Sequence, residues 1–198
     1  MGLEIRYIYG QTPLSEEENE ALLIKTISTR SELDEFEQQN IESAIEWTLK
    51  QKSSADKILT MDFILEVHKQ MFNRIWKWAG TYRKTNKNIG VDKFQIVEEL
   101  RVLLDDCKYW IENELFSHDE IAVTLKHRLV KIHPFPNGNG RHSRLIADIL
   151  ISHVFSDKVF SWGGSNLTKA GDSRKKYLEA IYKADEGDIA PLINFARS

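Results

Sequence analysis

The residues best suited to chemistry lie in one short segment, 133–144. It begins with His133, whose side-chain type has an unperturbed pKa near neutral pH and can therefore take up and release a proton. The residues that follow can hold phosphate oxygens, through backbone amides that a ligand can approach or through guanidinium groups: Gly138, Asn139, Gly140, Arg141 and Arg144. This set is typical of a site that binds a polyphosphate beside a base.

The segment is expected to be a loop that leads into a helix. Pro134 and Pro136 exclude a helix at its start, because proline lacks an amide donor and forces the preceding residue away from helical backbone angles. An apolar run begins at Leu145, and the spacing of Arg141 and Arg144 places both on one helical face. Free N–H groups at a helix start attract anions. Taken singly, the histidine could cap a helix, the glycines could form a plain turn and the arginines could lie on a solvated helix face. Because all of these residues occur together at this spacing, a phosphate-binding loop is favoured.

The same residues resemble the signature of Fic proteins, His-x-Phe-x-(Asp/Glu)-Gly-Asn-Gly-Arg-x-x-Arg. Asn137 is the one departure, because the family usually has Asp or Glu at that position. Residues 78–83 and 88–91 resemble the flap of the family, and residues 177–195 its closing segment. The chain length, Asn137 and the flap sequence together look most like the subfamily called mobile mystery protein B. The resemblance covers roughly residues 30–197.

The resemblance implies an all-α fold, a Fic-type helical bundle with a small β-hairpin flap. Residues 1–30 are expected to form an N-terminal arm and a short helix, and residues 31–198 the Fic domain. Residues 82–96 lack helical periodicity and contain turn residues, so the hairpin is expected there. Elsewhere apolar residues recur three and four positions apart, as in amphipathic helices, over residues 33–49, 63–72, 100–111, 121–132, 145–150, 177–181 and 189–195.

The activity implied by the resemblance is transfer of AMP from ATP to a serine, threonine or tyrosine hydroxyl of a target protein. His133 would be the general base, and the loop amides would surround the phosphates with the Asn139 side chain donating to one oxygen. Arg141 and Arg144 would pair with the β and γ phosphates. The flap residues would bind the main chain of the target by strand-like pairing: Asn88, Ile89, Gly90 and Val91. Four flap cations could assist the docking of the target: Arg83, Lys84, Lys87 and Lys93.

Asn137 is the expected metal ligand and also the position at which the motif departs from the family pattern. In the family an Asp or Glu there holds the Mg²⁺ that bridges the phosphates, whereas an amide oxygen ligates a hard cation without supplying charge. Three outcomes stay open: Mg²⁺ bound mainly by phosphates with Asn137 as a weak ligand, another carboxylate as substitute, or a donor other than ATP. We favour the first, with ATP and Mg²⁺ as substrate and cofactor.

Two alternatives to an active transferase are a non-catalytic or altered-donor nucleotide-binding module, and a toxin-like component with a separately encoded regulatory partner. Many Fic proteins are autoinhibited by a helix that carries Ser/Thr-x-x-x-Glu-Gly/Asn. Ser31 and Glu35 have that spacing, but Phe36 follows, so an acidic scaffold helix is the favoured interpretation.

Bulk composition narrows the remaining choices. A net charge of -3 over 198 residues argues against a general nucleic-acid-binding protein. The single cysteine, Cys107, excludes an internal disulfide, and no apolar run reaches membrane-spanning length, so a cytoplasmic protein is expected. Cys107 is expected in the core, as are Trp76 and Trp78, while Trp162 could border the adenine. Phe135 should anchor the loop, and His142 is expected to be exposed.

Overall fold

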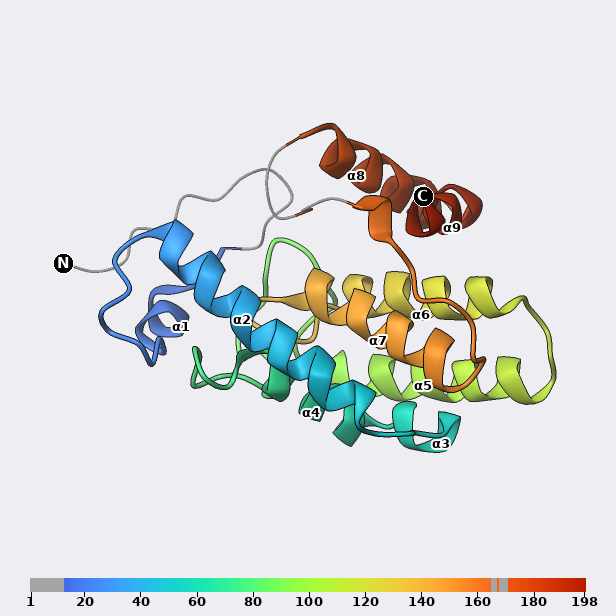
Figure 1. Ribbon diagram of the computed structural model, residues 1–198, viewed down its shortest axis with the longest axis horizontal. Helices are drawn as coiled ribbons and strands as arrows, with labels where there is room; N and C mark the ends of the chain where they lie inside the picture. Colours follow the sequence, from blue (N-terminus) through green and yellow to red (C-terminus); the bar gives the residue numbers. More distant parts are fainter. Residues whose placement is uncertain (1–12, 165–166, 168–170) are drawn as a thin grey trace.

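The computed structural model describes residues 13–164, 167 and 171–198, and over these residues it is built almost entirely of helices (Figure 1). This confirms the predicted all-α fold. The elements are α1 (Glu16–Glu20), α2 (Arg30–Leu49), α3 (Ala55–Ile58), α4 (Met61–Phe72), α5 (Ile96–Glu112), α6 (His118–Ile132), α7 (Asn139–His153), the 3-10 helix η1 (Trp162–Gly164), α8 (Asp172–Asp185) and α9 (Ala190–Arg197).

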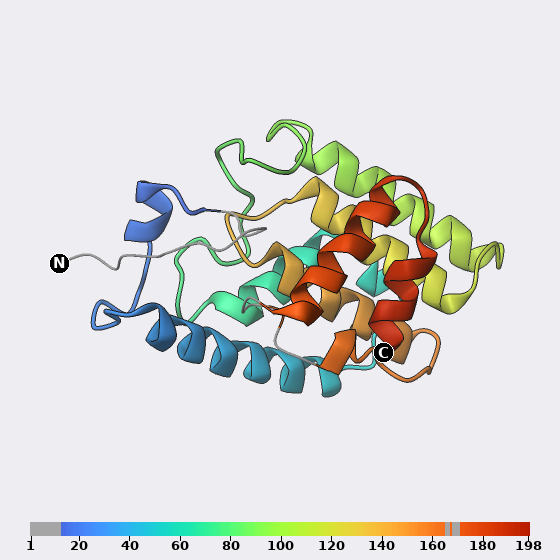
Figure 2. The ribbon, with the colours of Figure 1, turned by 90° about the horizontal axis from the view of Figure 1, so that it is seen from above.

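The core lies where α6 and α7 pack against each other, with α5 on the outer side of α6 and α4 against α7. Helix α2 crosses α4, while α8 and α9 pack together over α6 and α7 (Figures 1 and 2). The predicted apolar stripe of α4 faces the core. All five residues of that stripe are buried: Phe63, Ile64, Val67, Met71 and Phe72. Cys107 is buried in the same core, as predicted, and burial raises the pKa of its thiol to about 12.

Helix starts follow capping chemistry. Ser15 caps α1 with the Glu18 side chain returning to it, as expected for a serine followed by acids. At the start of α2, Thr29 accepts the hydrogen bond of the cap and the Glu32 side chain completes the capping box.

The expected hairpin at residues 82–96 is not formed; turns and bends occupy 83–95, and the isolated β-bridge of the described residues lies elsewhere, between Leu22 and Trp76. The physical reason is that the flap backbone donates to carbonyls at the end of α6 and in the loop that follows it, rather than forming a ladder of its own. The Arg83 N–H donates to the Pro134 carbonyl at 2.9 Å, and the Val91 N–H donates to the Ile132 carbonyl at 3.3 Å. The flap is thus tied directly to the chemically important loop.

The described part of the expected N-terminal arm, from Pro13 onwards, packs on the helical body. Leu22 and Ile27 are buried in the core, and the Leu23 N–H donates to the Ile75 carbonyl at 2.8 Å. The first twelve positions of that arm lie outside the described residues. Within the described part of the chain, the helices are too short or too polar to cross a membrane.

Candidate active site

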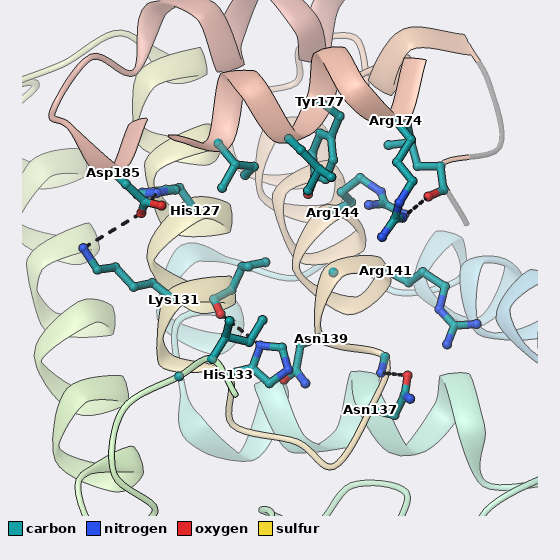
Figure 3. Close-up of a pocket in the computed structure, with 18 of the residues that line it drawn as sticks. His127, Lys131, His133, Asn137, Asn139, Arg141, Arg144, Arg174, Tyr177 and Asp185 are labelled. Carbon is teal, nitrogen blue, oxygen red and sulfur yellow. Dashed lines mark hydrogen bonds and ion pairs between the residues drawn. The ribbon is translucent and has the colours of Figure 1, made fainter. Parts of the chain in front are cut away.

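A cavity of about 560 Å³ lies between the loop that joins α6 to α7, the flap, and α8 (Figure 3). Every predicted site residue except Asn88 lines it: Ile89, Gly90, Val91, His133, Asn137, Gly138, Asn139, Gly140, Arg141 and Arg144. Asn88 is exposed outside the cavity. The fold therefore brings together residues from the flap and from the loop that are more than forty positions apart in the chain.

His133 ends α6 in a left-handed backbone conformation, with φ 56° and ψ 59°, which turns the chain sharply into the loop. Its Nδ1 lies 3.2 Å from the Val130 carbonyl oxygen, and because a carbonyl only accepts, Nδ1 is the protonated nitrogen. Nε2 is then the acceptor of the ring, as a general base requires. Burial lowers the pKa of His133 to about 4, opposed by the Val130 bond and reinforced by Arg83 and Lys87. The pKa is thus lower than the near-neutral value expected from residue type.

The side chain of Asn139 closes the loop after His133. The Asn139 side chain accepts a hydrogen bond from the Phe135 N–H at 2.9 Å and donates to the Phe135 carbonyl at 2.9 Å. It is buried, and these two bonds use its oxygen and one of its two N–H groups, so the donation of the other N–H to a phosphate oxygen stays a prediction. Phe135 is fully buried, which confirms its predicted role as the anchor of the loop.

Gly138 is the N-cap of α7 and has no side chain to satisfy the amides of the first turn. Its φ of +78° favours glycine, and a Cβ there would lie 2.5 Å from the Phe72 ring, so no larger residue fits. The residues of this first turn, Asn139, Gly140 and Arg141, line the cavity, and amides without a side-chain cap suit an anion such as phosphate.

Asn137 offers a single neutral oxygen. Its Oδ1 accepts a hydrogen bond from the Gly138 N–H at 2.6 Å. No group of three or more His, Cys, Asp or Glu side chains placed to hold a metal occurs among the described residues, so a substitute carboxylate site finds no support there. Asp185, an acidic residue in the lining, lies 2.9 Å from His127 Nε2. A bound Mg²⁺ would fit Asn137 Oδ1 as one ligand, with phosphate oxygens and water as the others.

The two arginines do not form one clamp. The Arg141 guanidinium lies 2.5 Å from the Glu37 carboxylate and 5.0 Å from the centre of the Phe72 ring. Glu37 is buried and also accepts the Trp76 indole N–H at 2.7 Å. Arg144 instead reaches toward α8, with its guanidinium 5.7 Å from the Tyr177 ring. Figure 3 shows Arg141 pointing away from the part of the cavity that Arg144 and Arg174 share.

The flap approaches His133 closely at Gly90, where φ is +108° and a Cβ would lie 2.7 Å from the Cβ of His133. Arg83 holds this approach in place: it is buried, and its Nε donates to the His133 carbonyl at 2.7 Å, while Nη2 donates to the Val91 carbonyl. Lys87 forms an ion pair with Glu18, and Lys93 donates to the Lys84 carbonyl at 2.9 Å. Arg83 and Lys87 therefore brace the flap, which contradicts their interpretation as free docking cations.

Two predictions about aromatic side chains near the site, those for His142 and Trp162, are wrong because both side chains are buried. His142 is fully buried with Nε2 2.9 Å from the Ile64 carbonyl, so its predicted exposure is wrong; it shares the aromatic cluster of Phe135. Trp162 does not border the cavity, because its indole is buried and donates to Asp148 at 3.1 Å. Burial raises the pKa of the Asp148 carboxyl to about 7. Trp76 and Trp78 are buried, as predicted.

Sequence reasoning missed the acid that holds Arg141 and the α8 residues of the lining. The spacing could have predicted that Glu37 is buried, because it falls four residues after Leu33 and four before Ile41, on the buried stripe of α2. Glu35 lies on the exposed face of the same helix. The missed lining residues of α8 are Arg174, Tyr177, Leu178, Ile181, Tyr182 and Asp185. Tyr177, Leu178 and Ile181 were recognised only as an apolar helix face, since nothing in their spacing indicates a cavity.

The family model for the Fic/DOC family matches residues 58–151. A protein from Nematostella vectensis named protein adenylyltransferase Fic is 30% identical over 153 residues, which are 75% of this chain and 33% of that protein. The protein of the same name from Aedes aegypti is 28% identical over 141 residues, 69% of this chain and 27% of its own length. The chain thus spans a third or less of the length of these two relatives.

Solved structures agree on the fold. The VirB-translocated effector protein BepC of Bartonella tribocorum, crystallised with bound AMPPNP, superposes with a TM-score of 0.68 at 17% identity. The match covers 92% of this chain and 97% of BepC. The shared helical architecture, the relatives and the family model lead to one conclusion: residues 58–151 of this chain belong to the Fic/DOC family.

Proposed function

We propose that this chain is a protein adenylyltransferase that moves AMP from ATP to a hydroxyl group of a target protein. One observation carries the proposal: the acceptor nitrogen of His133, the uncapped start of α7 and Arg144 line a single cavity. Relatives named protein adenylyltransferase Fic share this part of the chain, and BepC, which has the same fold, holds AMPPNP. These likenesses support the proposal and do not identify the target.

In the proposed reaction, the target hydroxyl oxygen attacks the α phosphorus while its proton passes to Nε2 of His133. The bond between the α phosphorus and the bridging oxygen breaks, and pyrophosphate leaves with that oxygen. The N–H groups of Asn139 and Gly140 would hold the phosphates, and Arg144 would pair with the outer ones. In-line positioning and charge neutralisation are the main needs of phosphoryl-type transfer.

Arg141 would have a different role from Arg144. Its ion pair with Glu37 draws the guanidinium toward α2, so it would set the edge of the phosphate pocket and contribute mainly at longer range. The flap residues Ile89, Gly90 and Val91 line the cavity and would bind the main chain of the target, with Asn88 as a contact outside the cavity. Mg²⁺ bound through the phosphates would neutralise part of their charge.

The test is incubation with labelled ATP, Mg²⁺ and cell lysate, beside the variant His133→Ala. We expect the variant to lose about 10²- to 10⁴-fold of transfer rate, because a positioned general base acts in the transition state. Nucleotide affinity and the fold should change little, as titration and circular dichroism would show. Transfer at the wild-type rate by His133→Ala would remove His133 from the reaction.

The second candidate is a module that uses another phosphorylated donor or only binds nucleotide, and Asn137 favours it because the loop lacks the usual carboxylate. A donor screen distinguishes the two functions: lysate is incubated with different nucleotides or with a choline-containing donor, and the added mass on target proteins is measured by mass spectrometry. An added mass of AMP supports the first proposal. Another mass, or binding without any added mass, supports the second.

Several finer assignments are part of the proposal. Membership in the mobile mystery protein B subfamily is not supported by the relatives above and rests on chain length, Asn137 and the flap sequence. A separately encoded regulatory partner depends on the same resemblance, and the division into residues 1–30 and 31–198 depends on the resemblance to Fic proteins. A cytoplasmic location depends on the single cysteine and on the lack of an apolar run of membrane-spanning length. Co-purification of this chain with the product of the neighbouring gene would test the partner directly.

A further inference from the structure

His68 of α4 touches the loop of the active site although it lies 69 positions from Asn137 in the chain. Its side chain is fully buried, and its ring stacks on Phe135 with the ring centres 3.7 Å apart and the planes 8° apart. The Gly80 N–H donates to Nδ1 at 2.9 Å, and Nε2 lies 3.1 Å from the Asn137 carbonyl oxygen. The imidazole therefore joins three segments: α4, the turn before the flap, and the phosphate loop.

The two partners determine which ring nitrogen carries the proton. A backbone N–H only donates, so Nδ1 must be the unprotonated acceptor for Gly80. The one ring proton is then on Nε2 and is donated to the Asn137 carbonyl. Burial lowers the pKa of His68 well below its usual range, His142 and Arg141 lower it further, and the bond to Asn137 opposes them. His68 is thus a neutral imidazole in one tautomer.

The bond matters because of where the Asn137 carbonyl lies. In a trans peptide the carbonyl and the following N–H point in opposite directions. The Asn137–Gly138 peptide is therefore held at both edges, by His68 at the carbonyl and by Asn137 Oδ1, 2.6 Å from the Gly138 N–H. The next residues begin α7 and supply the amides that face the cavity. A rotation of this one peptide would turn those amides away from a phosphate.

We propose that His68 is a positioning residue for the nucleotide site, which orients the Asn137–Gly138 peptide through a hydrogen bond donated by Nε2. The proposal rests on the proposed function in that a nucleotide is the ligand of this loop. The hydrogen bond itself concerns the protein alone and can be measured without any ligand.

Two variants separate the two bonds of the ring. In His68→Gln the amide nitrogen reproduces Nε2 and keeps the donor to Asn137, whereas in His68→Asn the amide oxygen reproduces Nδ1 and keeps only the acceptor for Gly80. Both lose the aromatic stack with Phe135, so their melting temperatures should fall together. We expect His68→Asn to lose about 10- to 100-fold in kcat and to bind ATP more weakly, because a small misplacement of reacting groups is costly. His68→Gln should stay within about threefold of the wild type in both.

His142→Gln is the matched control. It removes a second buried imidazole from the same aromatic cluster, but its Nε2 bond goes to Ile64 in α4 rather than to the loop. It should lose stability without the loss of ATP affinity seen in His68→Asn. Equal effects of His68→Asn and His68→Gln on ATP affinity and kcat, or an equal effect of His142→Gln, would overturn the proposal.

A ligand-free measurement keeps the proposal testable if the variants fold poorly or if the chain transfers nothing. Nitrogen-15 NMR of the wild type should show the His68 proton on Nε2 throughout the range in which free histidine titrates, about pH 5–8. Amide exchange at residues 138–141 should be faster in His68→Asn than in His68→Gln. A proton on Nδ1, or equal exchange in the two variants, would exclude this role. Loss of transfer activity alone would refute only the proposed function.

Discussion

The two sides of the cavity differ in whether their polar groups have partners within the protein, and we call the side with such partners the matched side and the other the open side. On the side of α2 and α4, Arg141 is paired with buried Glu37, and the Asn137 carbonyl is held by His68. On the side of α8, Arg144 has no ion pair with a carboxylate among the described residues. There burial alone would raise the pKa of Tyr177, yet Lys126 and Arg144 beside it lower the pKa overall. The first side stabilises the loop, and the second has a positive field available for an anion.

The largest effect on stability should come from removing the ion pair of the matched side. Arg141→Ala leaves Glu37 buried without its charged partner, which should lower the free energy of unfolding by about 3 kcal/mol. Urea unfolding of the two proteins gives the difference. Adding Glu37→Gln should recover part of the loss, because the unpaired charge is gone.

Glu35→Gln is the control for that experiment, since Glu35 lies on the exposed face of the same helix and should change stability little. A stability loss in Arg141→Ala below that of Arg144→Ala would contradict the assignment of the matched side.

Acid should also weaken the fold around the loop through two buried histidines. Burial lowers the pKa of His133 to about 4 and of His142 to about 3, whereas unfolded histidine titrates near 6.5. Below pH 6.5 the unfolded chain binds more protons than the folded chain, so stability falls as the pH falls. At pH 5 each of these histidines should cost about 2 kcal/mol relative to pH 7.

Urea unfolding at pH 7 and pH 5 measures this loss. The variant His142→Gln should show a smaller difference between the two pH values than the wild type, by about the share of one histidine. The same stability at both pH values would contradict the burial of these histidines in their neutral form.

The open side is tested by Arg144→Ala. We expect ATP affinity to fall about 10- to 100-fold, the usual effect of losing a charge-assisted hydrogen bond, with a smaller loss for AMP. The fold should persist, because the cavity side of Arg144 has no carboxylate partner to be left unpaired. Calorimetric titration with both nucleotides is the measurement. Equal losses for ATP and AMP would place Arg144 away from the outer phosphates.

The smallest effect is expected from Asn137→Asp, which lies between the two sides. An aspartate oxygen can still accept the Gly138 N–H, so the loop should keep its shape. The added charge should lower the Mg²⁺ concentration for half-maximal transfer by up to about tenfold, since ligand charge raises the affinity of such sites. Transfer rate against Mg²⁺ at fixed ATP gives the answer. An unchanged or raised requirement would remove Asn137 from the metal site.

The local part of the site could be predicted from the sequence. Two prolines, two glycines and two arginines within twelve residues dictate a loop, a helix start and a cationic face, because these are properties of neighbouring residues. The helices of the core were likewise predictable from apolar spacing, and α4 is the clearest case. Even the buried cysteine of α5 followed from its place on a stripe.

What the tertiary structure decided was the partner of each polar group. Arg141 and Arg144 look equivalent in the sequence, and only the crossing of α2 over α4 brings Glu37 to the first of them. Asn139 was expected to face the ligand, and only the fold of the loop ties its side chain to the backbone of Phe135 as well. The flap does not form a hairpin because its amides donate to carbonyls at the end of α6 and in the loop that follows it. Local sequence determines which groups need partners; the packing of distant segments determines which partners they meet, and so which groups remain for a ligand.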